Sequence, residues 1–273
     1  MNSSKQLIFN ADDYGLCEAV NQAVEQLISA QRLSSVSVLA NGDSVNTAVS
    51  FLLQHPHIDA GIHLNVVEGA PLNPPSSHPW LTNAQGELAG RGALLKRWLL
   101  HPRAVTCAVE NEWRTQIETL RNAGLTLRHA DSHQHLHGFP LAYPIAVRLC
   151  RDYGIPALRW PRERHSATAR RLSGSALHAS LFVSNWLTPA SGLRRNAHFL
   201  GFRHAGHYDG AALLRDLALL PGGVTEVALH PSAQANFPYP AYRGDGELAA
   251  LLDAAWPGHL QRLGVEMIGW RDV

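Results

Sequence analysis

The chain has 273 residues, a mass of 29.8 kDa and a formal charge of +1, and 45% of its residues are hydrophobic. This length and apolar content suit one large domain whose core needs neither disulfides nor a structural metal. The near-zero charge argues against a nucleic-acid or membrane-surface binder, because both classes need an excess of basic residues on one face. The unusual feature is histidine, with 16 residues against 22 acidic ones.

The cysteines and the N-terminus indicate the compartment. Cys17, Cys107 and Cys150 are far apart, which is typical of reduced thiols and not of a disulfide framework or a zinc knuckle. No signal peptide follows Met1, and no run of 18 apolar residues could span a membrane. We therefore expect a cytoplasmic protein with no transmembrane segment, and the sequence leaves a homodimer open.

Apolar runs of strand length alternate with segments of helical period in the first half of the chain. The predicted strands are 7–9, 35–40, 60–66 and 125–130, and the predicted helices are 20–28, 45–53 and 105–120. Prolines and glycines interrupt the pattern between 68 and 92 and predict a long loop there. A loop of that length in a compact domain is usually functional or mobile.

The same alternation continues in the second half. The predicted strands are 155–160, 199–202, 225–229 and 265–269, and the predicted helices are 144–153, 175–186, 211–220 and 247–263. Strands that alternate with helices predict a parallel sheet with helical crossovers. At this length we expect a distorted (β/α) TIM-like barrel with seven to eight parallel strands. An open doubly wound sheet is the alternative, but the glycine-rich phosphate-binding motifs are missing.

No linker, repeat or low-complexity run divides the sequence. We therefore expect residues 1–273 to form a single domain, in which the loop 68–92 and the segment 163–197 resemble insertions. Both would shape substrate access or an oligomer contact.

Titratable and cationic side chains stand where five of the predicted strands end. They are Asp12, Asp13, His63, the run 131–137 with its three alternate histidines, Arg159 and His230. In a parallel barrel these strand ends gather on one face, which is where barrel active sites are built. We therefore expect these side chains to form one site.

Each of these residues also has a structural interpretation when it is taken alone. An acidic pair can form a turn, His63 can be a hydrogen-bonded core histidine, and Arg159 can belong to a buried ion pair. Three histidines within five residues beside Asp131 are more specific and favour metal binding or proton transfer. Strand alternation lets all three face one side, so the spacing does not choose the ligand among them.

The candidate residues together suit the hydrolysis of an amide or an ester. One aspartate and two histidines leave positions open on a divalent metal, which lowers the pKa of its bound water to about 7. A second carboxylate can accept a proton, a histidine can protonate the leaving group, and an arginine can keep the base ionised. No GxSxG elbow exists, and no cysteine stands in a catalytic setting.

Several motifs closely resemble those of the YdjC-like carbohydrate deacetylases, which include chitooligosaccharide and hopanoid-associated deacetylases. The matching stretches are 10–15 (NADDYG), 61–64 (GIHL), 131–140 (DSHQHLHGFP), 230–231 (HP) and 271–273 (RDV). The resemblance implies a distorted (β/α) barrel related to NodB-type deacetylases, and one divalent metal ion, Mg²⁺ or Zn²⁺. It also implies removal of an N-acetyl group from an amino sugar, in an oligosaccharide or a glycolipid. Two stretches, 67–75 and 201–207, are more similar to the hopanoid-associated branch.

The resemblance also implies roles by position. Asp13, His63 and His133 resemble the metal ligands, and Asp12 resembles the general base. His230 resembles the general acid, and Arg159 resembles the arginine that orients the base. The expected substrate-facing or supporting residues around this set are His135, His137, His204 and His207.

Two other functions remain open. Two histidines and one carboxylate could hold Fe(II) for oxygen chemistry, although the adjacent Asp12 and the barrel pattern argue against this class. A non-catalytic carbohydrate-binding or regulatory protein could also retain a metal site. The base and acid candidates disfavour that interpretation.

Overall fold

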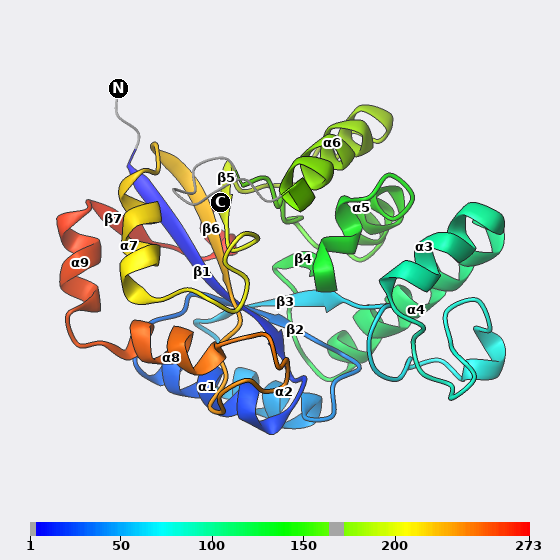
Figure 1. Cartoon of the computed structure of the whole chain (residues 1–273), viewed down its shortest axis with the longest axis horizontal. Coiled ribbons are helices and arrows are strands. Elements are labelled where there is room, and N and C mark those ends of the chain that lie inside the picture. Colours follow the sequence, from blue (N-terminus) through cyan, green and yellow to red (C-terminus); the bar gives the residue numbers. More distant parts are fainter. Residues whose placement is uncertain (1–3, 164–171) are drawn as a thin grey trace.

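The apolar strand segments form one parallel sheet. The computed structural model describes residues 4–163 and 172–273. In this part of the chain the sheet has seven strands in the order β4-β3-β2-β1-β6-β5, and β7 also pairs with β1 (Figure 1). The strands are β1 (Lys5–Tyr14), β2 (Ser35–Val38), β3 (Asp59–Leu64), β4 (His129–Ser132), β5 (His198–Leu200), β6 (Gly223–Leu229) and β7 (Val265–Met267).

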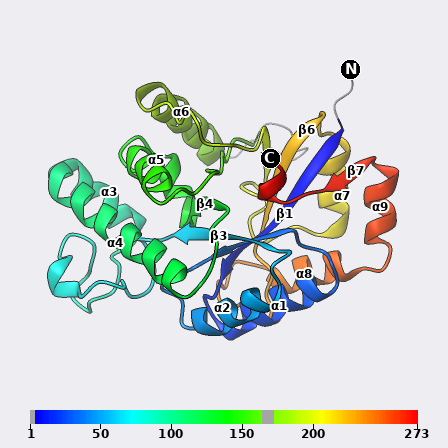
Figure 2. The same ribbon diagram turned by 180° about the vertical axis from the view of Figure 1, so that it is seen from behind.

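Helices lie outside the sheet and connect its strands (Figures 1 and 2). They are α1 (Glu18–Ser29), α2 (Val45–Gln54), α3 (Arg91–Leu100), α4 (Pro102–Asn122), α5 (Tyr143–Asp152), α6 (Leu172–Leu187), α7 (Gly210–Ala218), α8 (Gly244–Leu252) and α9 (Trp256–Arg262). In α4 the residues that predicted the helix lie on its buried face, as Val105, Val109 and Trp113 do. In the described residues, no helix combines the length and the apolar content that crossing a bilayer requires.

The sheet curls but does not close through paired strands. All its pairings are parallel, which confirms the predicted distorted α/β architecture. Between β4 and β5 the seam is crossed only by two isolated bridges in the described residues, Ala130 with Leu158 and Ala157 with Arg194. Ala130 N donates to Ala157 O at 2.9 Å, and Leu158 N donates to Arg194 O at 3.1 Å.

The prediction of a full strand over 155–160 is wrong, because this segment makes only isolated bridges. Pro156 and Pro161 have no N–H group to donate, so a regular ladder cannot extend through their positions. The short segment nevertheless brings Arg159 into the interior of the barrel.

Other elements also differ from the predictions. The segment predicted over 125–130 becomes a strand only at His129, where it meets Gly61 of β3. The helix predicted over 247–263 is two helices, because Pro257 cannot donate a helical bond to the carbonyl of Asp253. The predicted loop 68–92 ends in an additional helix, α3, which begins at Arg91. The helix predicted over 175–186 lies within α6, and residues 164–171 of the same segment lie outside the described residues.

Candidate active site and metal centre

An irregularity at the end of β1 places two adjacent acids in the same site. The pairing of β1 with β2 shifts register between Ala11 and Tyr14, and Asp13 has a φ of 60°. In a regular strand, neighbouring side chains point to opposite faces. The bulge removes this alternation, so Asp12 and Asp13 both lie buried beside His63.

Asp13, His63 and His133 form a buried cluster at the centre of the site. One ligand atom from each lies within 4.8 Å of the others. Asp13 Oδ1 lies 3.3 Å from His63 Nε2 and 2.9 Å from His133 Nδ1. Asp13 Oδ2 is buried and has no hydrogen-bond partner among the described residues. A carboxylate with an unused oxygen and two imidazoles fit a divalent cation.

The protonation of this cluster follows from its charges. Burial alone would raise the pKa of Asp13, but the neighbouring His133 and His63 hold this pKa well below its usual range. Burial alone would lower the pKa values of both histidines, yet the carboxylates raise that of His63 well above its usual range and that of His133 to about 9. A bound cation would displace these protons, because metals bind neutral imidazole.

Each of the two histidines also forms a hydrogen bond to a second carboxylate through its other ring nitrogen. His63 Nδ1 donates to Asp131 Oδ1 at 2.8 Å. His133 Nε2 donates to Glu68 Oε2 at 3.0 Å. These bonds fix both rings with their other nitrogen directed at Asp13, as is usual around protein metal sites.

Arg159 is fully buried and binds three carboxylates. Its Nη1 and Nη2 donate to Asp12 Oδ2 and Oδ1 at 2.8 and 2.7 Å. Nη2 also lies 2.6 Å from Asp131 Oδ2, and Nε donates to Glu226 Oε1 at 2.9 Å. Burial alone would raise the pKa of Asp12, but Arg159 outweighs this effect and lowers it. Asp12 is therefore kept ionised.

His230 lies across from Asp12, with its Nε2 4.0 Å from Asp12 Oδ2. Burial lowers the pKa of His230, and its Nδ1 has no partner among the described residues. Its backbone N–H donates to Glu247 Oε2 at 2.6 Å, which fixes the start of the loop after β6.

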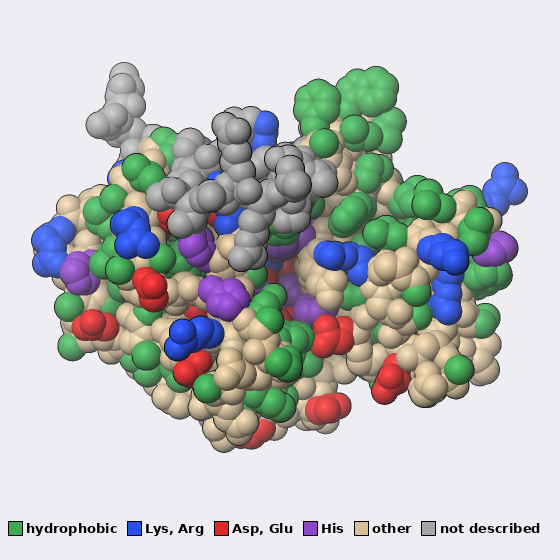
Figure 3. Space-filling model, viewed as in Figure 1, with side chains coloured by type: hydrophobic (Ala, Val, Ile, Leu, Met, Phe, Trp, Pro, Cys, Tyr) green, Lys and Arg blue, Asp and Glu red, His purple; other side chains and the backbone are tan. Residues whose placement is uncertain are grey.

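Two hollows adjoin the site, and both are lined by Tyr239. The first is lined by Asp12, Asp13 and His230, and the second is lined by Glu68 and His133. The Tyr239 ring stacks on His133 with a centroid distance of 6.1 Å. Figure 3 shows histidine side chains gathered near the middle of one face of the molecule. Side chains of the cluster therefore line both hollows.

The other four candidate histidines lie around this set. His137 bonds to Ser132 Oγ at 2.6 Å and to the backbone oxygen of Arg159 at 3.1 Å, so it supports the arginine and does not face Asp13. The His135 ring packs against the rings of Phe199 and Phe202. His204 Nε2 lies 3.7 Å from Asp216 Oδ2, and His207 is exposed beside Tyr242.

The structure thus brings together Asp12, Asp13, His63, His133, Arg159 and His230. Sequence reasoning gave no role to Asp131, Glu68, Glu226 or Glu247. A signal existed for two of them: Asp131 precedes the histidine run, and Glu226 is an isolated acid in an apolar strand. Glu68 lies in an irregular loop and Glu247 in a helix, where a single acid is ordinary.

A family model described as YdjC-like protein matches residues 6–262 of the chain. A carbohydrate deacetylase of Vibrio parahaemolyticus is 32% identical over 151 residues, which cover 55% of this chain and 57% of that protein. The match thus spans less than two thirds of that relative's length. A carbohydrate deacetylase of Mus musculus is 27% identical over 271 residues, which cover 92% of this chain and 84% of that protein.

A solved structure from Enterococcus faecalis V583, described as a candidate cellobiose-phosphate cleavage protein, shares the fold. Its TM-score is 0.79, with 21% sequence identity and 99% of both chains covered. The likeness over the full length agrees with the curled parallel sheet described above. From the family match, which covers nearly the whole sequence, we conclude that the chain belongs to the YdjC-like family.

Proposed function

We propose that this protein is a metal-dependent hydrolase that removes an N-acetyl group from an amino sugar, with residues 1–273 acting as one catalytic domain. The observation that carries the proposal is the buried Asp13–His63–His133 cluster beside an aspartate clamped by an arginine. Relatives named carbohydrate deacetylases support the substrate class, an N-acetylated oligosaccharide or glycolipid. The three free cysteines favour a reducing compartment, so we propose that it acts in the cytoplasm.

One divalent ion, Mg²⁺ or Zn²⁺, would be held by Asp13, His63 and His133. The donor set and the unpartnered Asp13 Oδ2 fit such an ion. Such an ion would polarise an acetamide carbonyl and lower the pKa of a water molecule, so that this water could lose a proton and act as the nucleophile at neutral pH. Two imidazole ligands favour Zn²⁺, whereas the family resemblance implies Mg²⁺.

Asp12 would serve as the general base. Its Oδ1 accepts hydrogen bonds from Asn10 and Arg159, whereas among the described residues Oδ2 accepts one only from Arg159. Oδ2 therefore has the spare lone pair that can take a proton from the attacking water. Arg159 keeps this carboxylate ionised and fixes its orientation.

His230 would serve as the general acid toward the departing amine. Its Nε2 faces the same oxygen, Asp12 Oδ2, at 4.0 Å. Burial keeps this imidazole neutral at pH 7, so it can accept a proton. Because the two groups lie close together, the proton taken by Asp12 needs only a small movement to reach it. The two groups then complete a proton cycle: water loses a proton, and the amine gains one.

Acetate release from N-acetylated chito-oligomers and glycolipid-like acetamides tests the proposal. We expect a chelated sample to be inactive, Zn²⁺ or Mg²⁺ to restore activity, and Asp13→Ala to lose at least about 100-fold in kcat/KM. Asp152→Ala, at an exposed carboxylate of α5, is the control. Equal acetate release by the chelated protein, the Asp13→Ala variant and the untreated protein would overturn the metal mechanism. Sugar binding without turnover under every metal would indicate a carbohydrate-binding protein instead.

A further inference from the structure

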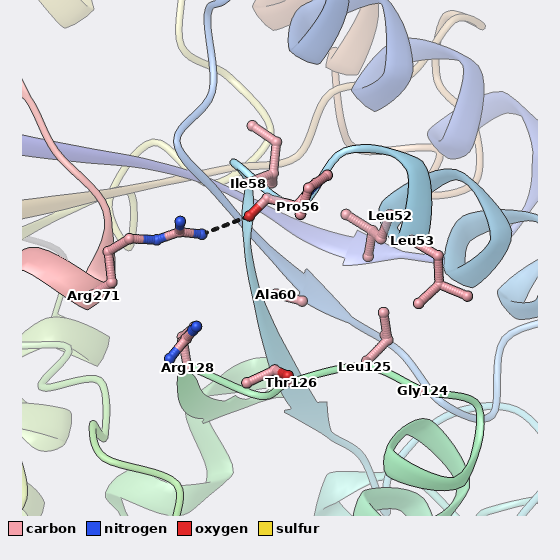
Figure 4. A pocket seen from close by; sticks show the side chains of 10 residues that line it. All are labelled: Leu52, Leu53, Pro56, Ile58, Ala60, Gly124, Leu125, Thr126, Arg128 and Arg271. Carbon is pink, nitrogen blue, oxygen red and sulfur yellow. Dashed lines mark hydrogen bonds between the residues drawn. The ribbon is translucent and has the colours of Figure 1, made fainter.

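A separate hollow lies at the opposite ends of the strands from the candidate active site. It is bounded by Ile58 and Ala60 at the start of β3 and by Leu125 and Arg128 just before β4 (Figure 4). Its cavity volume is about 170 Å³. This is below the range of sites for drug-sized ligands, so only a small molecule fits.

One end of this hollow is positively charged. Arg271 is fixed there, because its guanidinium binds Asp59 and its Nη2 donates to Pro56 O at 3.0 Å. Arg128 is half-buried, and its side chain makes no ion pair or hydrogen bond within the described part of the chain. None of the described residues that line the hollow is acidic, so no carboxylate of the lining neutralises the charge of Arg128.

The other end of the hollow is apolar. Leu52 and Leu53 of α2 lie opposite the two arginines, and Leu125 lies beside them (Figure 4). Leu53 is 52% exposed, so it offers apolar surface at this end of the hollow. The charge and the apolar surface are therefore separated along one hollow.

We infer that this hollow binds a small amphiphilic anion, in which a carboxylate or phosphate monoester is joined to a short apolar chain. A guanidinium presents a planar pair of donors that matches both oxyanions, and Arg128 has such donors unused. The leucines would bury the apolar chain. An uncharged amphiphile would leave Arg128 desolvated without a counter-ion, and a cationic one would be repelled. The inference is independent of the proposed deacetylation.

Calorimetric titration with hexanoate, hexyl phosphate, hexanol and hexylammonium tests this inference. We expect the two anions to bind at least about tenfold more tightly than the other two probes. Arg128→Gln should weaken anion binding by about tenfold or more. Leu53→Ser, at an exposed position that folding tolerates, should weaken it several-fold.

Control variants outside the lining and a variant in the candidate active site test whether the anion binds in this hollow and not elsewhere. Arg103→Gln on α4 and Leu99→Ser on α3 change exposed residues outside the lining and should leave binding unchanged. Binding should also persist in Asp13→Ala, where an anion held by a metal would be lost. Affinities that do not depend on head-group charge, or that do not change in Arg128→Gln, would overturn the inference. If inorganic phosphate binds as tightly as hexyl phosphate, the inferred contact of the leucines with an apolar chain is wrong. If Arg128→Gln does not fold, Leu53→Ser and the selectivity among the four probes decide.

Discussion

Arg159 is the residue on which the charge balance of the site depends. It binds Asp12 through two parallel bonds and also contacts Asp131 and Glu226, and it is fully buried. Lysine keeps the charge but lacks the planar set of N–H donors of a guanidinium. Arg159→Lys therefore leaves some of the carboxylate oxygens without a hydrogen-bond donor. We expect kcat/KM for acetate release to fall by about 100-fold and thermal stability to fall as well.

The control is Arg148→Lys, at an exposed arginine of α5 that pairs with Glu110. It should change neither quantity measurably. An unchanged kcat/KM in Arg159→Lys would show that Asp12 does not need the two parallel hydrogen bonds from the guanidinium.

The three histidines of the 133–137 run have different surroundings, and metal content distinguishes them. His133 points at Asp13, whereas both ring nitrogens of His137 are occupied by Ser132 and by the backbone of Arg159. We expect His133→Ala to lose the metal and His137→Ala to retain it, with a loss of about 1–3 kcal/mol in unfolding free energy. Elemental analysis after dialysis and urea unfolding measure the two effects. Full metal occupancy in His133→Ala together with loss in His137→Ala would contradict this assignment.

The sequence predicted which candidate residues lie together better than it predicted the partners that support them. Asp12, Asp13 and His133 stand in short motifs at strand ends, so their neighbourhood follows from the parallel topology. The bond between His133 and Glu68 depends on the path of an irregular loop, which no local pattern encodes. Likewise, spacing alone did not separate His133 from His137, because the left-handed backbone at Gln134 and His135 replaces the expected strand alternation.

At the scale of elements, the packing of β3 against β4 depends on one glycine that has no side chain to displace its neighbour. Gly61 pairs with His129, and a Cβ atom on Gly61 would lie 2.1 Å from the His129 ring. The ring occupies this space, bonds to Ser37 Oγ at 3.0 Å and stacks on Trp270. Gly61→Ala should therefore lower the unfolding free energy by about 1–3 kcal/mol, as measured by urea denaturation.

A second substitution tests whether the clash is the cause. In a His129→Ala background, Gly61→Ala should cost clearly less than it does alone, because the ring is absent. Gly92→Ala in α3 is the control, since a Cβ atom there meets nothing within 4 Å. It should be neutral or stabilising by about 0.5–1 kcal/mol. Equal costs of Gly61→Ala in both backgrounds would contradict the steric explanation.

Elements with a strong apolar period were predictable, and those limited by proline were not. The α4 helix follows from its regular spacing of buried residues. By contrast, 155–160 has strand composition, but its proline neighbours leave it with isolated bridges. The pattern over 247–263 also continues across Asp253 although the helix does not. In both cases a missing N–H group outweighs apolar periodicity.

For the whole molecule, a formal charge of +1 conceals a strongly charged interior. Arg159 lies among three buried carboxylates. Burial raises the pKa of one of them, Glu226, to about 7. Composition alone could not indicate this, because the pairing depends on how the sheet curls. It also could not show that α7 and α8 lie together beside the loop after β6, where Glu247 is enclosed.

Glu247 makes the stability of the whole protein depend on pH. Burial raises its pKa from 4.5 to about 7, although the backbone N–H groups of His230 and Tyr208 oppose this. Between pH 4.5 and 7 the folded state therefore binds more protons at this position than the unfolded state, so its contribution to stability falls as the pH rises. Glu247→Gln removes this dependence.

We therefore expect the unfolding free energy of the wild type, relative to Glu247→Gln, to decrease by up to about 3 kcal/mol from pH 4.5 to pH 8. Urea denaturation of both proteins at several pH values measures this difference, in which the contributions of other groups cancel. Glu266→Gln, at an exposed carboxylate of β7, controls for the loss of a surface carboxylate. Parallel stability curves for the wild type and Glu247→Gln would show that Glu247 does not take up a proton in the folded protein over this range.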